Sequence, residues 1–472
     1  MQFDICCMKF TRHIVLKSVI IVLMLVCFIP SVYGLIYPKS AAPNGYNFYP
    51  IPNDTIGVSM WLADVYRFYK AKELRTESIK SSLTSDMRWG VDSMLARQVP
   101  GFGFLPSSSR APQLKTILKE SYEIFSHACN FKASVKRVRP CRRLRETTFG
   151  VESAYSSSIM PGGSSEYSFP SSHASTSWGI ALTLMCVNPW KADTIVNRGL
   201  AHSQSRVIGG VHWQSDVDAG KVLATANYAR IFSYDSLLNL MDRARSQTLV
   251  ELGRDAYPTF EELYANDDTL ALLTQRLPGP DDMSTPVGSC DMAVLVDKMS
   301  KCTSSTVTAA TKQKDLSTAN ILSCFSSQMG KTITSTSHPA VYALVDMHLR
   351  LCRKMCEQMQ DRYSKPRPYD ILHIVPLTGE SVDTVANDGY PSLHSAMGWT
   401  ASLVLMTLRP SYQNTILKQG VSFGENRIAT GCTWPSDVEM GCLVASIAYG
   451  YVTSCSEYNS MVRAALAEFN SH

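Results

Sequence analysis

The motif Ser171-Ser172-His173-Ala174-Ser175 occurs a second time, 221 residues further along the chain, as Ser392-Leu393-His394-Ser395-Ala396. The same offset relates further residues downstream: Trp178 and Trp399, Pro189 and Pro410, Arg206 and Arg427, Gly210 and Gly431, Trp213 and Trp434, and finally Ser215-Asp216-Val217 and Ser436-Asp437-Val438. A constant offset over so long a run, without an insertion or deletion, indicates that the chain contains two copies of one domain.

The repeat predicts how the 472 residues are divided. We expect the first copy to occupy residues 43–255, a linker residues 256–287, and the second copy residues 288–472. Each copy then has about 200 residues, which is an ordinary size for a domain. The polar stretch at 277–282, which contains two prolines, is typical of a connecting loop.

Helical periodicity dominates the first copy. Apolar residues recur at helical spacing within residues 111–131, and a second helix is predicted over residues 172–187, where Asn188-Pro189 follows it. A third helix is predicted to begin near residue 215 and to continue past residue 229. Patterns typical of strands are scarce, so we predict an all-α fold of two tandem helical bundles.

The first 34 residues predict an export signal. Basic residues precede an apolar core at 19–29, and Val32-Tyr33-Gly34 after it offers a small-residue cleavage site. The core is shorter than the roughly 20 residues that span a bilayer. We therefore expect a cleaved signal peptide and a product that is secreted or held in a periplasmic or secretory-vesicle lumen. The alternative is an uncleaved signal anchor.

The composition excludes several classes of protein. Apolar residues make up 45% and charged residues 18%, which excludes a mainly disordered chain. The formal net charge is only +5, and we expect no nucleic-acid partner, because the basic cluster at 132–145 lies in a protein with an export signal. Within that cluster, Lys136, Arg137 and the arginines after Arg139 are predicted to form a solvated rim. Apart from the alternative signal anchor, we expect no stable membrane insertion.

The cysteines and one glycosylation sequence agree with export. Eleven of the fourteen cysteines follow residue 34, and an oxidising compartment would permit disulfides among them. Cys352 and Cys356 alternatively are buried residues of one helix. The sequon Asn53-Asp54-Thr55 is usable only in a secretory pathway that glycosylates.

Three polar elements of the first copy carry the candidate chemistry: Lys132 with Arg139-Pro140, Pro170-Ser171-Ser172-His173, and Ser205-Arg206 followed by His212 and Asp216. The elements contain three cations, Lys132, Arg139 and Arg206, which suit the three non-bridging oxygens of a phosphoryl group. Ser171 precedes a predicted helix start, where a hydroxyl and free backbone N–H groups bind anions.

Two histidines in these elements suit acid–base and nucleophilic chemistry. Asp216 follows His212 by four residues, so in a helical turn its carboxylate can hold one ring nitrogen and leave the other as a nucleophile. His173 can protonate a leaving oxygen and later activate water. Neither a metal nor another cofactor is expected, because the cations supply the positive charge.

In this order and spacing, the three elements resemble the type 2 phosphatidic acid phosphatase superfamily, which includes the vanadium haloperoxidases. The stretch at 205–218 is most similar to class A bacterial non-specific acid phosphatases. The resemblance implies hydrolysis of small phosphomonoesters at mildly acidic pH through a phosphorylated His212, with His173 as general acid and Asp216 orienting His212. It implies that phosphate is bound by Lys132, Arg139, Ser171, Ser172 and Arg206. The family usually has glycine at position 172, and we expect the serine to reshape the site without abolishing it.

The second copy keeps five of these polar positions: Arg367, Ser392, His394, Arg427 and Asp437. It departs at three others, because Gln360 replaces the lysine, Leu393 replaces the usual glycine, and Thr433 replaces the nucleophilic histidine. A threonine hydroxyl beside a carboxylate is a poor substitute for imidazole. We predict a degenerate, inactive domain that keeps two arginines for anion binding.

Other functions remain open at this stage. The same residues could hold vanadate in a haloperoxidase or act on lipid phosphates, although the lipid enzymes are usually multi-pass membrane proteins. Alternatively, both copies are anion-binding or scaffold modules without catalysis. The second copy could be a structural partner of the first, and self-association into a homo-oligomer stays open. Histidines outside the motifs, such as His202 and His348, are predicted to be structural.

Overall fold

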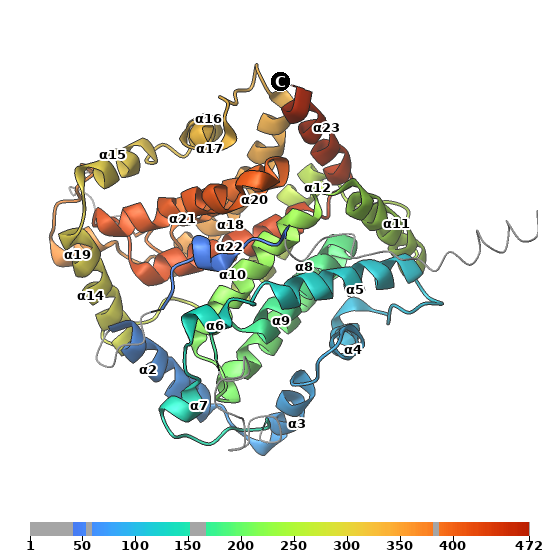
Figure 1. Cartoon of the computed structure of the whole chain (residues 1–472), viewed down its shortest axis with the longest axis horizontal. Helices are drawn as coiled ribbons and strands as arrows, with labels where there is room; N and C mark the ends of the chain where they lie inside the picture. The colour runs from blue at the N-terminus through green and yellow to red at the C-terminus, as the bar shows by residue number, and fades with distance from the viewer. Residues whose placement is uncertain (1–40, 53–58, 152–166, 381–386, 472) are drawn as a thin grey trace, which may run out of the picture.

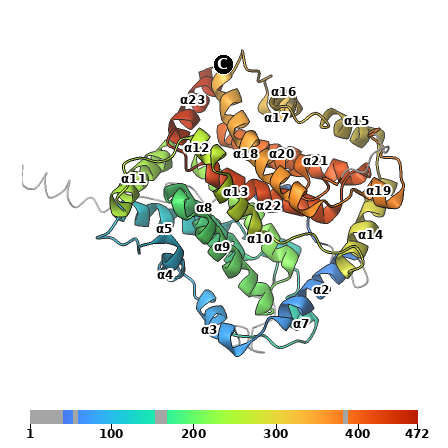
Figure 2. The same cartoon turned by 180° about the vertical axis from the view of Figure 1, so that it is seen from behind.

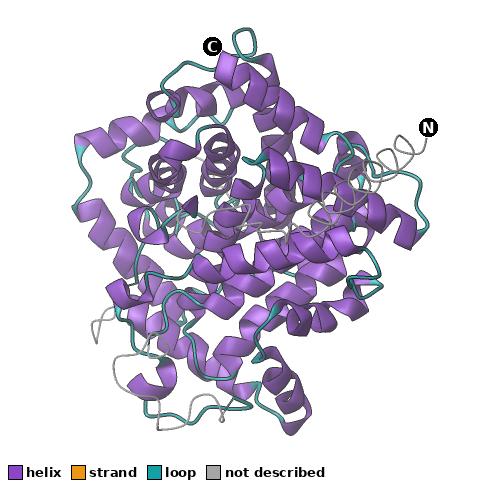
Figure 3. Ribbon diagram, turned by 45° about the vertical axis from the view of Figure 1, so that its right-hand side comes forward, coloured by secondary structure: helices purple, strands orange, loops and turns teal. Residues whose placement is uncertain are grey.

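The computed structural model describes residues 41–52, 59–151, 167–380 and 387–471. These residues form helices and no β-strand (Figure 3), which confirms the all-α prediction. No helix among them is both long and apolar enough to cross a bilayer. The predicted signal peptide at 1–34 and the sequon at 53–55 lie outside the described residues.

Within the described residues, the first copy has ten α-helices and two 3₁₀ turns. Their bounds are η2 Gly45–Asn47, α2 Ser59–Glu73, α3 Glu77–Asp86, α4 Val91–Phe102, α5 Pro112–His127, α6 Lys132–Val135, α7 Pro140–Arg143, α8 Ser172–Val187, η5 Pro189–Lys191, α9 Ala192–Ile208, α10 Gln214–Ile231 and α11 Asp235–Leu252. The three helices predicted from periodicity are found as α5, α8 and α10.

The second copy repeats the arrangement. Its elements are α14 Pro286–Ser300, α15 Ser304–Lys312, α16 Thr318–Cys324, α17 Ser326–Met329, α18 Pro339–Tyr363, α19 Pro368–Leu372, α20 Leu393–Leu408, η6 Pro410–Tyr412, α21 Gln413–Ala429, α22 Pro435–Val452 and α23 Tyr458–Ser471. The offset of the sequence repeat makes α20, α21 and α22 the equivalents of α8, α9 and α10. Cys352 and Cys356 are both buried in α18, and all eleven cysteines in the described residues are free thiols.

Two short helices lie in the stretch predicted as a linker, α12 Phe260–Ala265 and α13 Asp267–Gln275. Seen from behind (Figure 2), α13 lies between the copies, and it packs against both α9 and α18. The Tyr390 hydroxyl of the second copy donates a hydrogen bond to the Pro278 carbonyl at 2.7 Å. The connecting segment is therefore packed against both halves.

The two copies pack through equivalent surfaces. In Figure 1 the blue-to-green half lies below the yellow-to-red half. Helix α8 packs against α22, its counterpart α20 packs against α10, and α2 packs against α14. The contact between α8 and α22 is thus repeated by their counterparts, α20 and α10. A contact that recurs with the two copies exchanged is the arrangement of a two-fold dimer, here formed within one chain. One hydrophobic core runs through both copies.

Arg245 of α11, in the first copy, binds the backbone at the end of α22 in the second copy. Its side chain is buried, and its guanidinium donates to the carbonyls of Thr453, Ser454 and Cys455 at 2.8–2.9 Å. These carbonyls follow the last residue of α22, where a helix leaves acceptors unpaired. A cation there also interacts favourably with the helix dipole.

Replacing Arg245 with methionine is expected to destabilise the folded chain by about 3 kcal/mol, because buried carbonyls lose their donors. Chemical denaturation of the full-length protein measures this change. Arg243→Met on the exposed side of the same helix is the matched control and should change the free energy of unfolding by less than about 0.5 kcal/mol. Equal effects of the two substitutions would contradict the assignment of Arg245.

Candidate functional site

The first part of the site is the N-terminus of α8. Ser171 is the N-cap residue, and its hydroxyl accepts a hydrogen bond from the backbone N–H of Ala174. The N–H of Ser171 donates to the carbonyl of Asp216 at 2.8 Å, which joins α8 to α10. A Cβ at Gly220 would lie 2.6 Å from the Ser171 carbonyl oxygen, so glycine is what lets α10 approach this closely.

The second part is the turn between α9 and α10. Gly210 has a φ of +80°, a conformation that favours glycine, and its counterpart Gly431 has a φ of +81°. The N–H groups of Val211 and His212 then donate back to the carbonyl of Arg206. The turn places His212 two residues before the start of α10 and leaves its ring close to the first turn of that helix.

The ring of His212 lies between a carboxylate and a guanidinium. Nδ1 is 3.4 Å from Oδ2 of Asp216, and Nε2 is 3.1 Å from Nη1 of Arg139. Because a guanidinium only donates, Nε2 accepts, and the proton of the neutral ring sits on Nδ1 facing Asp216. Burial, followed by Arg139 and Lys132, holds the pKa of His212 well below its ordinary value. The ring is therefore neutral with its lone pair on Nε2.

His173 occupies the first turn of α8 and is buried. Its Nε2 lies 3.3 Å from the carbonyl oxygen of Met87, and its ring packs on the indole of Trp89 with centroids 3.9 Å apart. Burial, then Arg206 and His202, lowers the pKa of His173 well below the usual histidine value. A bound anion would raise the pKa of His173 again, because its negative charge opposes the effect of Arg206.

The cations come from three different elements. Lys132 begins α6 and donates to the carbonyls of Ser168 and Pro170, and burial is the main reason that its pKa falls to about 8. Arg206, near the end of α9, is fully buried and donates to the Leu83 carbonyl at 3.2 Å. The positive charges of both residues, like that of Arg139, lower the pKa of His212, so all three cations act on the same ring.

The structure therefore brings the predicted site residues of the first copy into one region: Lys132, Arg139, Ser171, Ser172, His173, Arg206, His212 and Asp216. Lys132 and Ser172 are half-buried, and the other six are buried. Among the described residues no cluster of histidine, cysteine, aspartate and glutamate side chains is arranged to hold a metal ion. The arrangement can hold a multiply charged anion next to an unprotonated imidazole nitrogen.

The prediction of a solvated rim is wrong for Arg137. Its side chain is buried and donates at 2.7 Å to Oδ1 of Asp216, to Oδ2 of Asp64 on α2, and to the Ser215 hydroxyl. Two buried carboxylates attract the guanidinium and replace its water. One sequence signal could have found it, because Lys365 of the second copy is also basic and also stands two residues before an Arg-Pro pair.

The second copy builds the same framework with altered chemistry. Lys365 donates to Oδ1 of Asp437 at 2.6 Å, as Arg137 does to Asp216. Gln360 donates to the carbonyls of Asp388 and Pro391 at 3.0 Å. Pro391 is the counterpart of Pro170, so a neutral amide takes one of the contacts that Lys132 makes. His394 lies at the start of α20, as His173 does in α8, and Ser392 is its N-cap residue.

The largest difference between the copies lies at the position of His212, where the second copy has Thr433. The hydroxyl of Thr433 and Oδ2 of Asp437 are both buried, and within the described residues neither has a hydrogen-bond partner. No imidazole of the described residues donates to Asp437, and burial raises the pKa of this carboxyl to about 7. The carboxylate–imidazole pair of the first copy therefore has no equivalent here.

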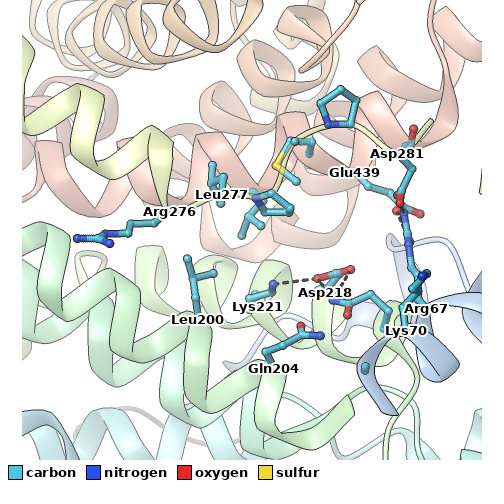
Figure 4. A pocket seen from close by; sticks show the side chains of 18 of the residues that line it. Arg67, Lys70, Leu200, Gln204, Asp218, Lys221, Arg276, Leu277, Asp281 and Glu439 are labelled. Carbon is cyan, nitrogen blue, oxygen red and sulfur yellow. Dashed lines mark hydrogen bonds and ion pairs between the residues drawn. The ribbon is translucent and has the colours of Figure 1, made fainter. Parts of the chain in front are cut away.

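A cavity of about 660 Å³ lies where the two copies meet (Figure 4). It is lined by α2, α9, α10, α22 and the connecting segment at 276–281, and it shares no lining residue with the histidine site. Lys221 pairs with Asp218 at 2.8 Å, and Arg67 pairs with Asp281 at 3.1 Å. Glu439 faces the cavity 3.9 Å from Arg67, and 44% of its side chain is accessible there. Enclosure of the cavity by the two copies keeps most bulk water away from this carboxyl and raises its pKa to about 8.

Glu439→Gln is expected to stabilise the chain more at pH 8 than at pH 4.5. The folded-state pKa of Glu439, about 8, lies above its ordinary value of 4.5, so unfolding releases a proton between these limits. The wild type therefore loses stability relative to the glutamine variant as pH rises through this window. Melting temperatures of both proteins at the two pH values provide the test, and a difference that does not depend on pH would contradict it.

Comparisons with known proteins agree with the repeat. A family model described as the PAP2 superfamily matches residues 121–237 and residues 340–461. The non-specific acid phosphatase of Providencia stuartii is 30% identical over 162 residues, which are 34% of this chain and 65% of that protein. The acid phosphatase of Zymomonas mobilis is 29% identical over 138 residues, 29% of this chain and 52% of the relative.

A third relative, the non-specific acid phosphatase of Salmonella typhi, is 25% identical over 163 residues, 34% of this chain and 65% of its own length. The chain thus spans less than two thirds of each of these three relatives. The two family matches together cover half of the chain and contain both histidine-bearing helices, α8 and α20. The protein belongs to the PAP2 superfamily, and carries its domain twice.

Proposed function

We propose that the first copy hydrolyses small phosphomonoesters, with His212 as the nucleophile. The observation that carries the proposal is the ring of His212, whose Nδ1 faces Asp216 and whose Nε2 faces Arg139. This arrangement holds a nucleophilic lone pair toward positive charge, where a phosphoryl group binds. The similarity to three bacterial acid phosphatases supports the same class of substrate.

The reaction is proposed to proceed in two displacements. Lys132, Arg139 and Arg206 bind the non-bridging oxygens, and Nε2 of His212 attacks phosphorus as the bond to the ester oxygen breaks. His173 gives its proton to that oxygen, and the alcohol leaves. Water then attacks the phosphohistidine, His173 takes a proton from the water, and the P–N bond breaks to release inorganic phosphate. Asp216 stabilises the positive charge that His212 acquires in the first displacement.

The expected activity is highest at mildly acidic pH and falls from about pH 5 to about pH 8. His173 must be protonated in the first displacement, and burial beside Arg206 lowers its pKa in the free site. A bound phosphate group raises the pKa of His173 again, so the ring is protonated at mildly acidic pH. In alkaline solution the ring is neutral. Hydrolysis of p-nitrophenyl phosphate by the full-length protein tests the proposal. No hydrolysis at any pH would refute it, and activity that rises toward pH 8 would refute the role of His173.

We also propose that only the first copy is catalytic and that the chain is exported. The second copy lacks an imidazole at the nucleophile position, where Thr433 stands. The basic and apolar pattern of residues 1–34 supports export. Amino-terminal sequencing of protein recovered from outside the cytoplasm tests both cleavage and location. A mature protein that still starts at residue 1 inside the cytoplasm would contradict this part of the proposal.

A further inference from the structure

The two arginines of the second copy occupy the positions of their first-copy counterparts. Nη1 of Arg367 donates to the Cys432 carbonyl at 3.1 Å, as Arg139 does to Val211 at 2.7 Å. Arg427 is buried near the end of α21, as Arg206 is in α9. The second copy thus keeps two cations where the first copy has three.

Two carboxylates of the same copy bind these arginines. Asp388 accepts from Nε of Arg367 at 2.6 Å and from Nη2 at 2.9 Å, which is a two-pronged pair. Glu380 accepts from Nη1 of Arg427 through one oxygen. Its other oxygen is held by the Thr378 hydroxyl and lies 3.6 Å from Sγ of Cys432.

We propose that the phosphate-binding cage of the second copy is closed by its own carboxylates, which take the places of phosphate oxygens on Arg367 and Arg427. Carboxylates and phosphates bind the guanidinium fork in the same two-pronged way. Among the described residues, the two arginines face two carboxylates, and these four groups together carry no net charge to attract an anion. The motif predicted that these arginines bind anions, and the two carboxylates take the place of the anion.

The change of lysine to Gln360 fits the closed cage. Its amide donates to the backbone carbonyl of Asp388, the residue that pairs with Arg367. A lysine at this position would add a third positive charge, which two carboxylates could not balance. The neutral amide keeps the hydrogen bond and leaves the cage neutral.

Acidity does not open the cage in the range where the first copy is proposed to work. Arg427 holds the pKa of Glu380 below its usual range against the opposing effect of burial. Arg367 does the same for Asp388. Both groups therefore stay ionised at mildly acidic pH and remain bound to the arginines. The second copy then acts as a rigid half of the molecule instead of a second anion-binding site.

Tungstate, an analogue of phosphate with strong anomalous scattering, tests the proposal in crystals of the full-length protein. In the wild type we expect no tungstate between Arg367 and Arg427. In the double variant Glu380→Gln, Asp388→Asn we expect tungstate at that position. Tungstate on these arginines in the wild type, or its absence from the double variant, would overturn the proposal. Tungstate near His212 is a separate observation that bears on the first copy alone.

Thermal melting with and without inorganic phosphate provides a second measurement. The double variant should gain more in melting temperature from millimolar phosphate than the wild type does, because phosphate restores charge balance at two buried arginines. Glu439→Gln, which removes a carboxylate beside Arg67 outside the cage, is the matched control and should gain as the wild type does. If the double variant does not fold, Glu380→Gln alone is used with the same criteria. Equal gains in all the proteins would overturn the proposal.

Discussion

Replacing His212 with alanine is expected to lower kcat/KM for p-nitrophenyl phosphate by about 10³-fold or more. The substitution removes the imidazole that lies 3.4 Å from Asp216 and 3.1 Å from Arg139. The cations remain, so binding of inorganic phosphate should persist while turnover is lost. Steady-state kinetics, combined with acid quenching to detect a phosphorylated enzyme, distinguish these two effects.

Thr433→Ala in the second copy is the matched control, because Thr433 stands at the equivalent position but in a copy that we propose is inactive. It should leave kcat and KM unchanged. Full activity of the His212 variant would refute the nucleophile assignment. A large loss in the Thr433 variant, with the fold intact, would show instead that the second copy takes part in catalysis.

Much of the fold can be predicted from the sequence, because residues related by a constant offset occupy equivalent positions in the two copies. The motif around His173 and its counterpart around His394 begin α8 and α20, and the helix bounds obey the same 221-residue offset. The order of the polar elements likewise predicted which side chains would meet. Side chains that bind one anion must lie close together in the fold. The lengths of the helices that carry them therefore limit how many residues can separate these side chains in the sequence.

Residues that act through a partner from elsewhere in the chain were harder to predict. Arg137 sits in a run of basic residues, and its burial depends on Asp64, which is 73 residues earlier in the sequence. Glu380 and Asp388 belong to no motif, and only the fold shows that they face Arg427 and Arg367. The packing of the copies through α2 and α14 also lies outside what periodicity reports, because periodicity identifies a buried face but not the helix that covers it.

Replacing Arg137 with methionine is expected to destabilise the folded chain by about 3–5 kcal/mol. The substitution leaves the carboxylates of Asp64 and Asp216 buried without the cation that both now contact at 2.7 Å. Chemical denaturation measures the loss. The exposed Lys136, next to it in the chain, is the matched control, and Lys136→Met should change stability by less than about 0.5 kcal/mol. Similar losses in both variants would contradict the role of Arg137.

Arg137→Lys separates the structural from the catalytic consequence. The second copy shows that a lysine at this place still pairs with the aspartate, since Lys365 contacts Asp437 at 2.6 Å. The variant should therefore fold, but an ammonium group cannot reproduce the fork that joins Asp216 to Asp64. Because Arg137 reaches the substrate only through Asp216 and His212, kcat should fall by about tenfold while KM changes little. If kcat and KM both keep their wild-type values, Arg137 stabilises the fold without positioning the nucleophile. If KM rises as much as kcat falls, Arg137 acts directly on the binding of phosphate. That result would contradict a role that passes only through Asp216 and His212.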